Sequence, residues 1–397
     1  MSRTETPPPA IPAEIPPFDY DPRTRMVFGA GSIEKLGTHV QKLGGRRVLL
    51  VTDAGLREAG HEDVAMRVLA DADVSVVVYD DVRANPTADD VEAGAAFARR
   101  HEIDMLIGLG GGSSMDCAKG INFLITNGGK IEDYWGIGKA SKPMLPLICV
   151  PTTAGTGSEA QSFAVIAHPT THLKMACGDK KAAAKVAILD PDLTISMPES
   201  VTAATGVDAI SHALETYVTT RRTPVSQIFS RQAWQLLCVA FPGVLLAPGN
   251  RAARGAMLLG AHLAGAAIEN SMLGATHAAA NPLTAHYDLT HGIAIGLMLP
   301  HVIRWNAEVA GTQYGELAAD AGLCEADDPA ASEHLAGFVK KIVARSGGPT
   351  SLVECGADRE LIPKLAAEAA EQWTGKFNPR PVAAADFEEL YRCALAD

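Results

Sequence analysis

The sequence predicts an α/β domain followed by an all-α domain, and three observations carry that prediction. From about residue 46 onward, short runs rich in β-branched residues alternate with helix-like stretches, the pattern of a parallel sheet with crossover helices. Beyond residue 198, long segments rich in alanine and leucine replace those runs. A chain of 397 residues is also too long for one hydrophobic core. We therefore expect a proline-rich arm over residues 1–22, an α/β domain over 23–195 and a helical domain over 196–397.

The α/β half shows its elements in a clear order. Strands are expected at VLLVTD (48–53), VSVVVYDD (74–81) and MLIGLG (105–110). One helix is expected over GLREAGHEDVAMRVLAD (55–71), and another begins after Thr87, which is followed by an acidic first turn. A third helix is expected to open at SSMDCAKG (113–120), and the later strand-like runs are PLICVPTT, FAVIAH and KVAILD.

The composition excludes several classes of function. The net charge of −12 without a basic run argues against nucleic acid as a partner. No stretch approaches the roughly 20 uninterrupted apolar residues of a membrane span, so no membrane partner is expected. Seven cysteines form no C-x-x-C pair and are an odd number, unlike a disulfide framework. Because the N-terminal stretch also lacks the apolar core of a signal peptide, we expect a cytoplasmic protein.

A glycine-rich segment, GLGGGSSMD (108–116), follows a strand and opens a helix. Bare backbone N–H groups at a helix N-terminus bind phosphate or pyrophosphate, although the spacing is not G-x-G-x-x-G and a plain turn is the alternative. FGAGSIEKLG (28–37) is a weaker rival, because no strong strand precedes it, and a tight turn is expected there. Asp53 ends the first strong strand, where a carboxylate can bind a ribose and repel a 2′-phosphate, or can cap the next helix.

Asp208 and His212 lie four residues apart in TGVDAISHALETY (205–217). On a helix they share a face with Cβ atoms about 6 Å apart, so they can bind one ion, although such pairs are often unrelated. His277 and His291 form a second pair, 14 positions apart.

The second pair requires the chain to reverse. On one straight helix His277 and His291 would stand about 21 Å apart at roughly 1.5 Å per residue. Asn281-Pro282 and Asp288 supply turn chemistry between them, so we expect the chain to fold back there.

Together the two pairs would offer three nitrogen ligands and one oxygen ligand. That set suits Zn²⁺ or Fe²⁺ with a position left for a substrate oxygen. Such an ion polarises a carbonyl, or lowers the pKa of an alcohol so that hydride can leave toward a nicotinamide. The remaining histidines of this region are expected to pack, face solvent or support the ligands; they are His262, His286 and His301.

In order, these motifs resemble the iron-containing (group III) alcohol dehydrogenase family. The resemblance extends over nearly the whole chain, through FGAGSIEKLG, VTDAGL, NPTADD, GGGSSMDCAK, PTTAGTGSEA, AILDPDLT, TGVDAISHALE, HAAANPLTAHYDLTHG and NPRP. It implies the fold shared with dehydroquinate synthase: a Rossmann-like dinucleotide-binding domain, a helical domain, and cofactor and metal in the cleft between them. It also implies a homodimer or larger homo-oligomer.

Carried over by motif, the family's metal ligands fall on Asp208, His212, His277 and His291. The implied cofactor is NAD rather than NADP, and the implied metal is Fe²⁺ or Zn²⁺. The implied cofactor-binding positions are Gly110, Gly111, Gly112, Ser113 and Asp116 at the pyrophosphate loop, Thr152, Thr153, Thr156 and Ser158 near the nicotinamide, Asp53 and Asn85 near the adenosine, and Lys174 and Leu193.

One position departs from the family's pattern. Many members carry a second histidine four residues after the third ligand, and here that position is Asn281. Asparagine can hydrogen-bond but cannot carry a proton near neutral pH. Either a water chain with a group such as His286 replaces that histidine, or this chain handles a different substrate.

The expected activity is hydride transfer between a nicotinamide cofactor and an alcohol, aldehyde or ketone, with Asn281 beside the four ligands in the catalytic site. The alternatives are a lyase of the dehydroquinate synthase type and a reductase like the maleylacetate reductases. The lyase needs a basic, phosphate-binding pocket, whereas the segment MLGATHAAANPLTA (272–285) near the ligands is small and apolar.

Overall fold

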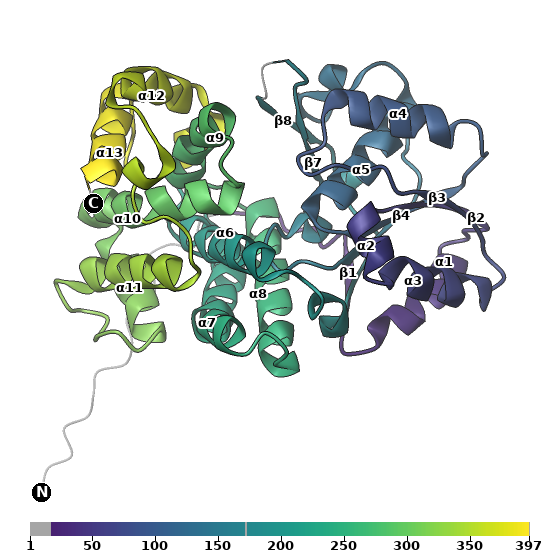
Figure 1. The fold of residues 1–397 in the computed structure, drawn as a ribbon, viewed down its shortest axis with the longest axis horizontal. Helices are drawn as coiled ribbons and strands as arrows, with labels where there is room; N and C mark the ends of the chain where they lie inside the picture. Colours follow the sequence, from purple (N-terminus) through teal and green to yellow (C-terminus); the bar gives the residue numbers. More distant parts are fainter. Residues whose placement is uncertain (1–16, 171–172, 397) are drawn as a thin grey trace, which may run out of the picture.

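The computed structural model describes residues 17–170 and 173–396. Figure 1 shows an α/β part, coloured purple to teal, beside a helical part, coloured teal through green to yellow. The predicted fold class is confirmed. Residues 1–16 of the predicted arm lie outside the described residues. Among the helices described, none is both long and apolar enough to cross a membrane.

The main sheet is parallel throughout, and within the described residues its strands follow the order β1-β9-β6-β4-β2-β3. These strands are β1 (Arg25–Phe28), β2 (Arg47–Val51), β3 (Ser75–Tyr79), β4 (Met105–Gly110), β6 (Leu147–Pro151) and β9 (Val186–Leu189). Parallel strands end at the same edge, where ligands of such sheets bind. The loops after β2, β4 and β6 therefore meet at one edge.

Helices cover both faces of this sheet because its strands are apolar on both sides. They are α1 (Leu36–Lys42), α2 (Ala54–Glu58), α3 (His61–Ala70), α4 (Ala88–Ala98) and α5 (Gly112–Asn127). Leu49 of β2 packs in the core beneath α4 and α5, and Leu50 packs in the core beneath α1 and α3. Successive strand residues point to opposite faces, so β2 contributes to both cores.

The prediction of a single helix over residues 55–71 is wrong, because this segment contains two helices, α2 and α3. Gly60 separates them with φ of 79° in the left-handed region, which glycine adopts at no steric cost. The helix expected after Thr87 is present as α4, with a capping box between Thr87 and Asp90.

The FGAGS segment forms a turn after β1, a strand that was not expected there. The carboxylate of Asp190 accepts hydrogen bonds from the backbone N–H groups of Gly31 (3.1 Å) and Ile33 (3.0 Å). Because a side chain of the protein occupies these two donors, they are not free to bind a phosphate. This supports the expected tight turn rather than a phosphate site.

In the described part of the chain a second, small sheet has the order β5-β8-β7. Its strands are β5 (Gly136–Ile137), β7 (Phe163–Ala167) and β8 (Lys174–Gly178). The strand β8 was not predicted, because KMACG is short and carries no β-branched residue. In Figure 1, β7 and β8 lie on the side of the α/β part that faces the helical part.

The helical part surrounds a long buried helix, α6. Its helices are α6 (Glu199–Val218), α7 (Pro224–Leu246), α8 (Arg251–Glu269), α9 (Ala275–Tyr287), α10 (His291–Asp320), α11 (Ala331–Arg345), α12 (Ile362–Glu371) and α13 (Ala384–Ala396). Most of α6 is buried, as its alanine-rich sequence permits. The expected boundary near residue 196 falls in the connection between β9 and α6.

The expected turn at Asn281-Pro282 is wrong. Helix α9 continues through Pro282 and ends at Tyr287. Asp288, with φ of 51°, adopts the left-handed conformation that ends the helix, and α10 begins at His291. The chain therefore reverses after Asp288, where a short polar side chain tolerates that backbone.

Candidate metal and cofactor site

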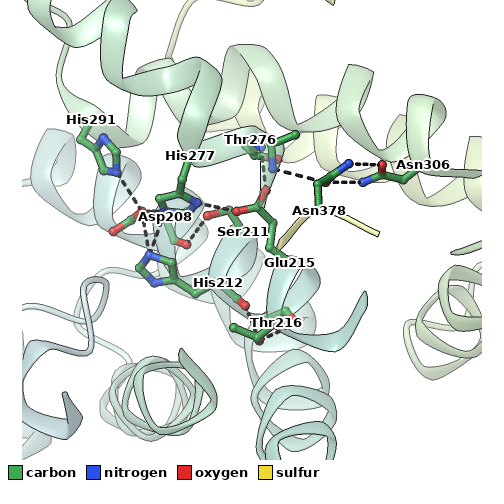
Figure 2. A network of polar contacts seen from close by, with 12 residues as sticks. Asp208, Ser211, His212, Glu215, Thr216, Thr276, His277, His291, Asn306 and Asn378 are labelled. Carbon is green, nitrogen blue, oxygen red and sulfur yellow. Dashed lines mark hydrogen bonds and ion pairs between the residues drawn. The ribbon is translucent and has the colours of Figure 1, made fainter. Parts of the chain in front are cut away.

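Four side chains converge where α6 meets α9 and α10 (Figure 2). Asp208 and His212 come from α6, His277 from the first turn of α9 and His291 from the first residue of α10. The Oδ1 atom of Asp208 lies 3.3 Å from Nε2 of His212, 3.6 Å from Nε2 of His277 and 3.8 Å from Nε2 of His291. The structure thus gathers both predicted pairs around one carboxylate oxygen.

The donor set fits a divalent metal ion. Ligand atoms of Asp208, His277 and His291 all lie within 4.8 Å of one another. The Nε2 atom of His212 stands 3.1 Å from Nε2 of His277. Among the described residues, Oδ1 of Asp208 is buried without a hydrogen-bond partner. A buried anionic oxygen without a donor is costly, and a cation would satisfy it.

The electrostatics favour an anionic carboxylate among imidazoles. Burial alone would raise the pKa of Asp208, but attraction to His212 and the other imidazoles lowers it well below its ordinary value. Burial and the neighbouring Lys174 lower the pKa of His291 well below 6.5, which keeps that ring neutral. Burial opposes protonation of His277, yet the neighbouring carboxylates of Asp208 and Glu215 raise its pKa to about 9. Metal binding requires loss of that proton.

Glu215 supports His277 from behind, and sequence reasoning missed it. Its Oε2 atom lies 2.6 Å from Nδ1 of His277, and its Oε1 atom accepts a hydrogen bond of 2.6 Å from the backbone N–H of Thr276. A carboxylate at Nδ1 fixes the tautomer that leaves Nε2 free to bind a metal. Glu215 stands seven residues after Asp208, on the same helix face, and that spacing was the available signal.

An asparagine pair fixes the first turn of α9. The Oδ1 atom of Asn378, from the NPRP motif, accepts hydrogen bonds from the backbone N–H of Ala275 (3.2 Å) and from Asn306 (3.1 Å). Asn378 donates in return to Oδ1 of Asn306 at 2.7 Å. Figure 2 shows this pair beside Glu215 and Thr276. The late motif therefore positions the helix that carries His277.

The glycine loop connects β4 to α5 with no side chain capping the helix at Gly111. Gly110 has φ of 147°, and a Cβ atom there would lie 2.4 Å from Oγ of Ser114. A Cβ atom on Gly112 would lie 2.7 Å from Cγ2 of Thr156. Both positions therefore require glycine, and the open helix N-terminus is suited to an anion such as pyrophosphate.

A cleft of about 410 Å³ contains both the histidine cluster and this loop. Its wall on the α/β side includes, among the predicted cofactor residues, Asn85, Gly111, Gly112, Ser113, Asp116, Thr153, Thr156, Ser158 and Lys174. Its wall on the helical side includes Asp208, His212, His277, Asn281 and His291. The structure thus brings most of the predicted site residues to one cavity.

Both halves of the chain match known families. Residues 22–191 match the family described as iron-containing alcohol dehydrogenase, and residues 202–395 match the Fe-containing alcohol dehydrogenase family, C-terminal. The chain belongs to the iron-containing alcohol dehydrogenase family.

Relatives of full length agree with this assignment. The chain is 33% identical to the NAD-dependent methanol dehydrogenase of Bacillus methanolicus, over 93% of this chain and 97% of that one. It is 33% identical to the 1,3-propanediol dehydrogenase of Klebsiella pneumoniae, over 95% of this chain and 99% of that one. Among solved structures, an alcohol dehydrogenase from Oenococcus oeni matches with a TM-score of 0.91 and 31% identity, covering 95% of this chain and 100% of that one.

Four predicted cofactor residues do not line the cleft: Asp53, Gly110, Thr152 and Leu193. Asp53 caps α2 through the backbone N–H of Leu56 at 3.2 Å and accepts a hydrogen bond from Ser114 at 3.2 Å. The backbone N–H of Thr152 donates to the carbonyl of Gly110 at 3.0 Å. Leu193 packs in the core of the sheet.

A buried lysine supports the loop that carries Ser158, and sequence reasoning missed it as well. Lys119 is fully buried and donates to the carbonyl and the Oγ of Ser158, at 2.8 and 2.7 Å, and to the carbonyl of Phe163 at 2.7 Å. Asp116 accepts a hydrogen bond of 2.5 Å from Ser158. Asp116 and Ser158 therefore hold each other as well as lining the cleft.

Asn281, the position that departs from the family's pattern, donates a hydrogen bond of 2.9 Å to Oε1 of Gln372. His286 lies 2.7 Å from Oε2 of Glu368 and does not line the cleft. His262 lies 3.2 Å from Oε1 of Glu159 in a buried contact between the two halves. Asn281 therefore connects α9 to the end of α12, and His286 is held outside the cleft.

Gly292 permits close packing beside His291. A Cβ atom at Gly292 would lie 1.9 Å from the backbone oxygen of Ala204 on α6, whereas one at Gly311, on the same helix, would meet nothing within 4 Å. Gly292→Ala is expected to destabilise the protein by about 1–3 kcal/mol. Gly311→Ala should stabilise it by about 0.5–1 kcal/mol. Thermal unfolding midpoints check this pair, and equal midpoints would contradict the packing described.

Proposed function

We propose that this chain is a metal-dependent dehydrogenase that transfers a hydride between NAD and an alcohol or aldehyde. The convergence of three imidazoles on Oδ1 of Asp208, in the same cleft as the open glycine loop, carries this proposal. Hydride transfer requires the cofactor and the alcohol carbon to meet, and only a shared cleft allows that. The names of the relatives support the same chemistry.

Different residues of the chain have different roles in this reaction. Asp208 and the three histidines hold the ion, which when bound supplies Lewis-acid polarisation of the substrate oxygen. Glu215 holds the tautomer of His277, and the N-terminus of α5 binds the pyrophosphate. The apolar side chains of Ile268, Met272 and Leu273 line the cleft and limit water near the reacting carbon.

The alcohol proton leaves without a histidine at position 281. Asn281 has no titratable group near neutral pH and is bonded to Gln372, and His286 is bonded to Glu368. Neither side chain is therefore assigned to the proton path, which would have to use water.

The finer parts of the proposal concern cofactor, ion and assembly. We assign NAD rather than NADP, Fe²⁺ or Zn²⁺ as the ion, and a homodimer or larger homo-oligomer. A cytoplasmic location is supported by the cysteines, all seven of which are free thiols.

The test is a set of alcohols and aldehydes assayed with NAD after loading the protein with ferrous iron or zinc. Net formation of NADH with an alcohol, dependent on the ion, is expected. A lyase that uses NAD transiently would turn over without net NADH, and that result would contradict the proposal.

The choice of NAD over NADP should depend on the charge of Asp53. Asp53→Ser keeps an oxygen that can cap α2 but removes the charge that would repel a 2′-phosphate. The ratio of kcat/KM for NAD to that for NADP should fall by about tenfold or more. Asp63→Ser, an exposed change on α3, is the control. An unchanged ratio in Asp53→Ser would leave Asp53 as a helix cap only.

A further inference from the structure

A second cavity, of about 590 Å³, adjoins the cleft. We call it the outer cavity; its own wall residues include Trp135, Ile137 and Leu173 from the small sheet and its flanks, with Glu371 from the end of α12. Four residues line both cavities, namely Phe163, Lys174, Ala176 and Trp373. The two cavities therefore lie side by side, with these shared side chains between them.

Two aromatic rings stand at this junction. The rings of Phe163 and Trp373 stack with centroids 6.0 Å apart and planes inclined by 29°. Phe163 lies across Gly178, its partner in the β7–β8 pair, where a Cβ atom would approach the ring to 2.3 Å. The ring of Phe377 packs edge-on against that of Trp373, with the two ring centroids 6.1 Å apart. The pair thus joins the small sheet to the helical part with both rings held by neighbours.

The outer cavity has an apolar wall that the protein leaves open. Trp135 is 48% exposed, Ile137 66% and Leu173 41%. Large apolar side chains gathered around a cavity mark a binding site for an apolar group. Three charged side chains also line this cavity: Glu368 is bonded to His286, Glu371 is exposed to solvent, and Lys174 lies near enough to His291 to affect its pKa.

We propose that the outer cavity binds the apolar tail of the substrate, so that primary alcohols and aldehydes with extended alkyl or aromatic tails are preferred. The inference rests on the proposed function, because it places the reacting oxygen at the histidine cluster and the tail beyond Phe163 and Trp373. The position of the outer cavity beside the cleft, with four lining residues in common, and the exposed apolar side chains of its wall select a substrate tail as the occupant. The volume greatly exceeds the needs of a two-carbon alcohol.

The kinetic test is kcat/KM for ethanol, 1-butanol, 1-hexanol and 1-octanol at saturating NAD. Each methylene buried in an apolar site contributes up to about fourfold, at about 0.8 kcal/mol. The ratio of 1-octanol to ethanol should exceed about 100-fold in the wild type. Trp135→Ala and Ile137→Ala should each lower that ratio by about tenfold, from lost apolar contact. Leu246→Ala removes a side chain on α7 that is 86% exposed, and should leave the ratio unchanged.

A binding test separates this inference from the proposed activity. Two of the four tryptophans, Trp135 and Trp373, line the outer cavity. Titration of 1-octanol into the NADH complex should change tryptophan fluorescence, and Trp135→Phe should reduce that change. If no alcohol yields NADH but 1-octanol still binds, the proposed activity is wrong and the outer cavity remains a binding site for an apolar group. A flat chain-length series, or one that Trp135→Ala and Ile137→Ala leave unaltered, would overturn the inference.

Discussion

Replacement of His277 by alanine is expected to remove the bound metal and lower kcat/KM by about 10²- to 10⁴-fold, because Lewis-acid polarisation is worth several kcal/mol. The variant should stay folded and bind NADH, since the glycine loop lies on the other wall of the cleft. Metal analysis of the purified protein and an NADH titration measure both expectations.

A matched control lies on the same helix. His286 lies nine residues further along α9 and contacts Glu368 rather than the cluster. His286→Ala should therefore retain the metal. Metal retained by His277→Ala, with normal turnover, would remove His277 from the site.

The second large effect is expected at Glu215, which touches no substrate and acts through His277. Glu215→Ala leaves Nδ1 of a buried imidazole without its carboxylate, and loss of such partners weakens metal affinity by about 10- to 100-fold. Glu215→Gln keeps the size and a carbonyl acceptor, so its loss should be smaller.

Metal dissociation constants of both Glu215 variants are the measurement that checks this role. Glu199→Gln, an exposed change at the start of α6, serves as the control and should match the wild type. If Glu215→Ala folds and binds the ion as tightly as the control, Glu215 is a packing residue rather than a positioning residue.

Local sequence patterns predicted the elements that depend on local physics. The alternation of β-branched runs and helices predicted β2, β3, β4 and the loop that opens α5, because strand propensity and a glycine-rich helix start are local properties. Spacing of four on a helix placed Asp208 and His212 on one face, and their closest atoms lie 3.3 Å apart.

Contacts between segments that are distant in the sequence were not predicted from local patterns. Lys119 receives its partners from residues 39 and 44 positions away, so no local pattern reveals it. For Glu215, the spacing from Asp208 indicates only a shared helix face, because its partner His277 lies 62 positions away. Pro282 indicated a turn because proline lacks a backbone N–H group, yet helix α9 continues through it. The short strand β8 exists because β7 pairs with it, not because its residues favour a strand.

The central claim is that Asp208, His212, His277 and His291 bind one catalytic ion. Anomalous scattering from crystals of the iron- or zinc-loaded protein, collected at the absorption edge of that metal, tests it directly. The account predicts a single peak per chain within about 2.0–2.2 Å of one Asp208 oxygen and the three Nε2 atoms. A peak bound elsewhere, or one that leaves any of these four residues outside the coordination sphere, would contradict it.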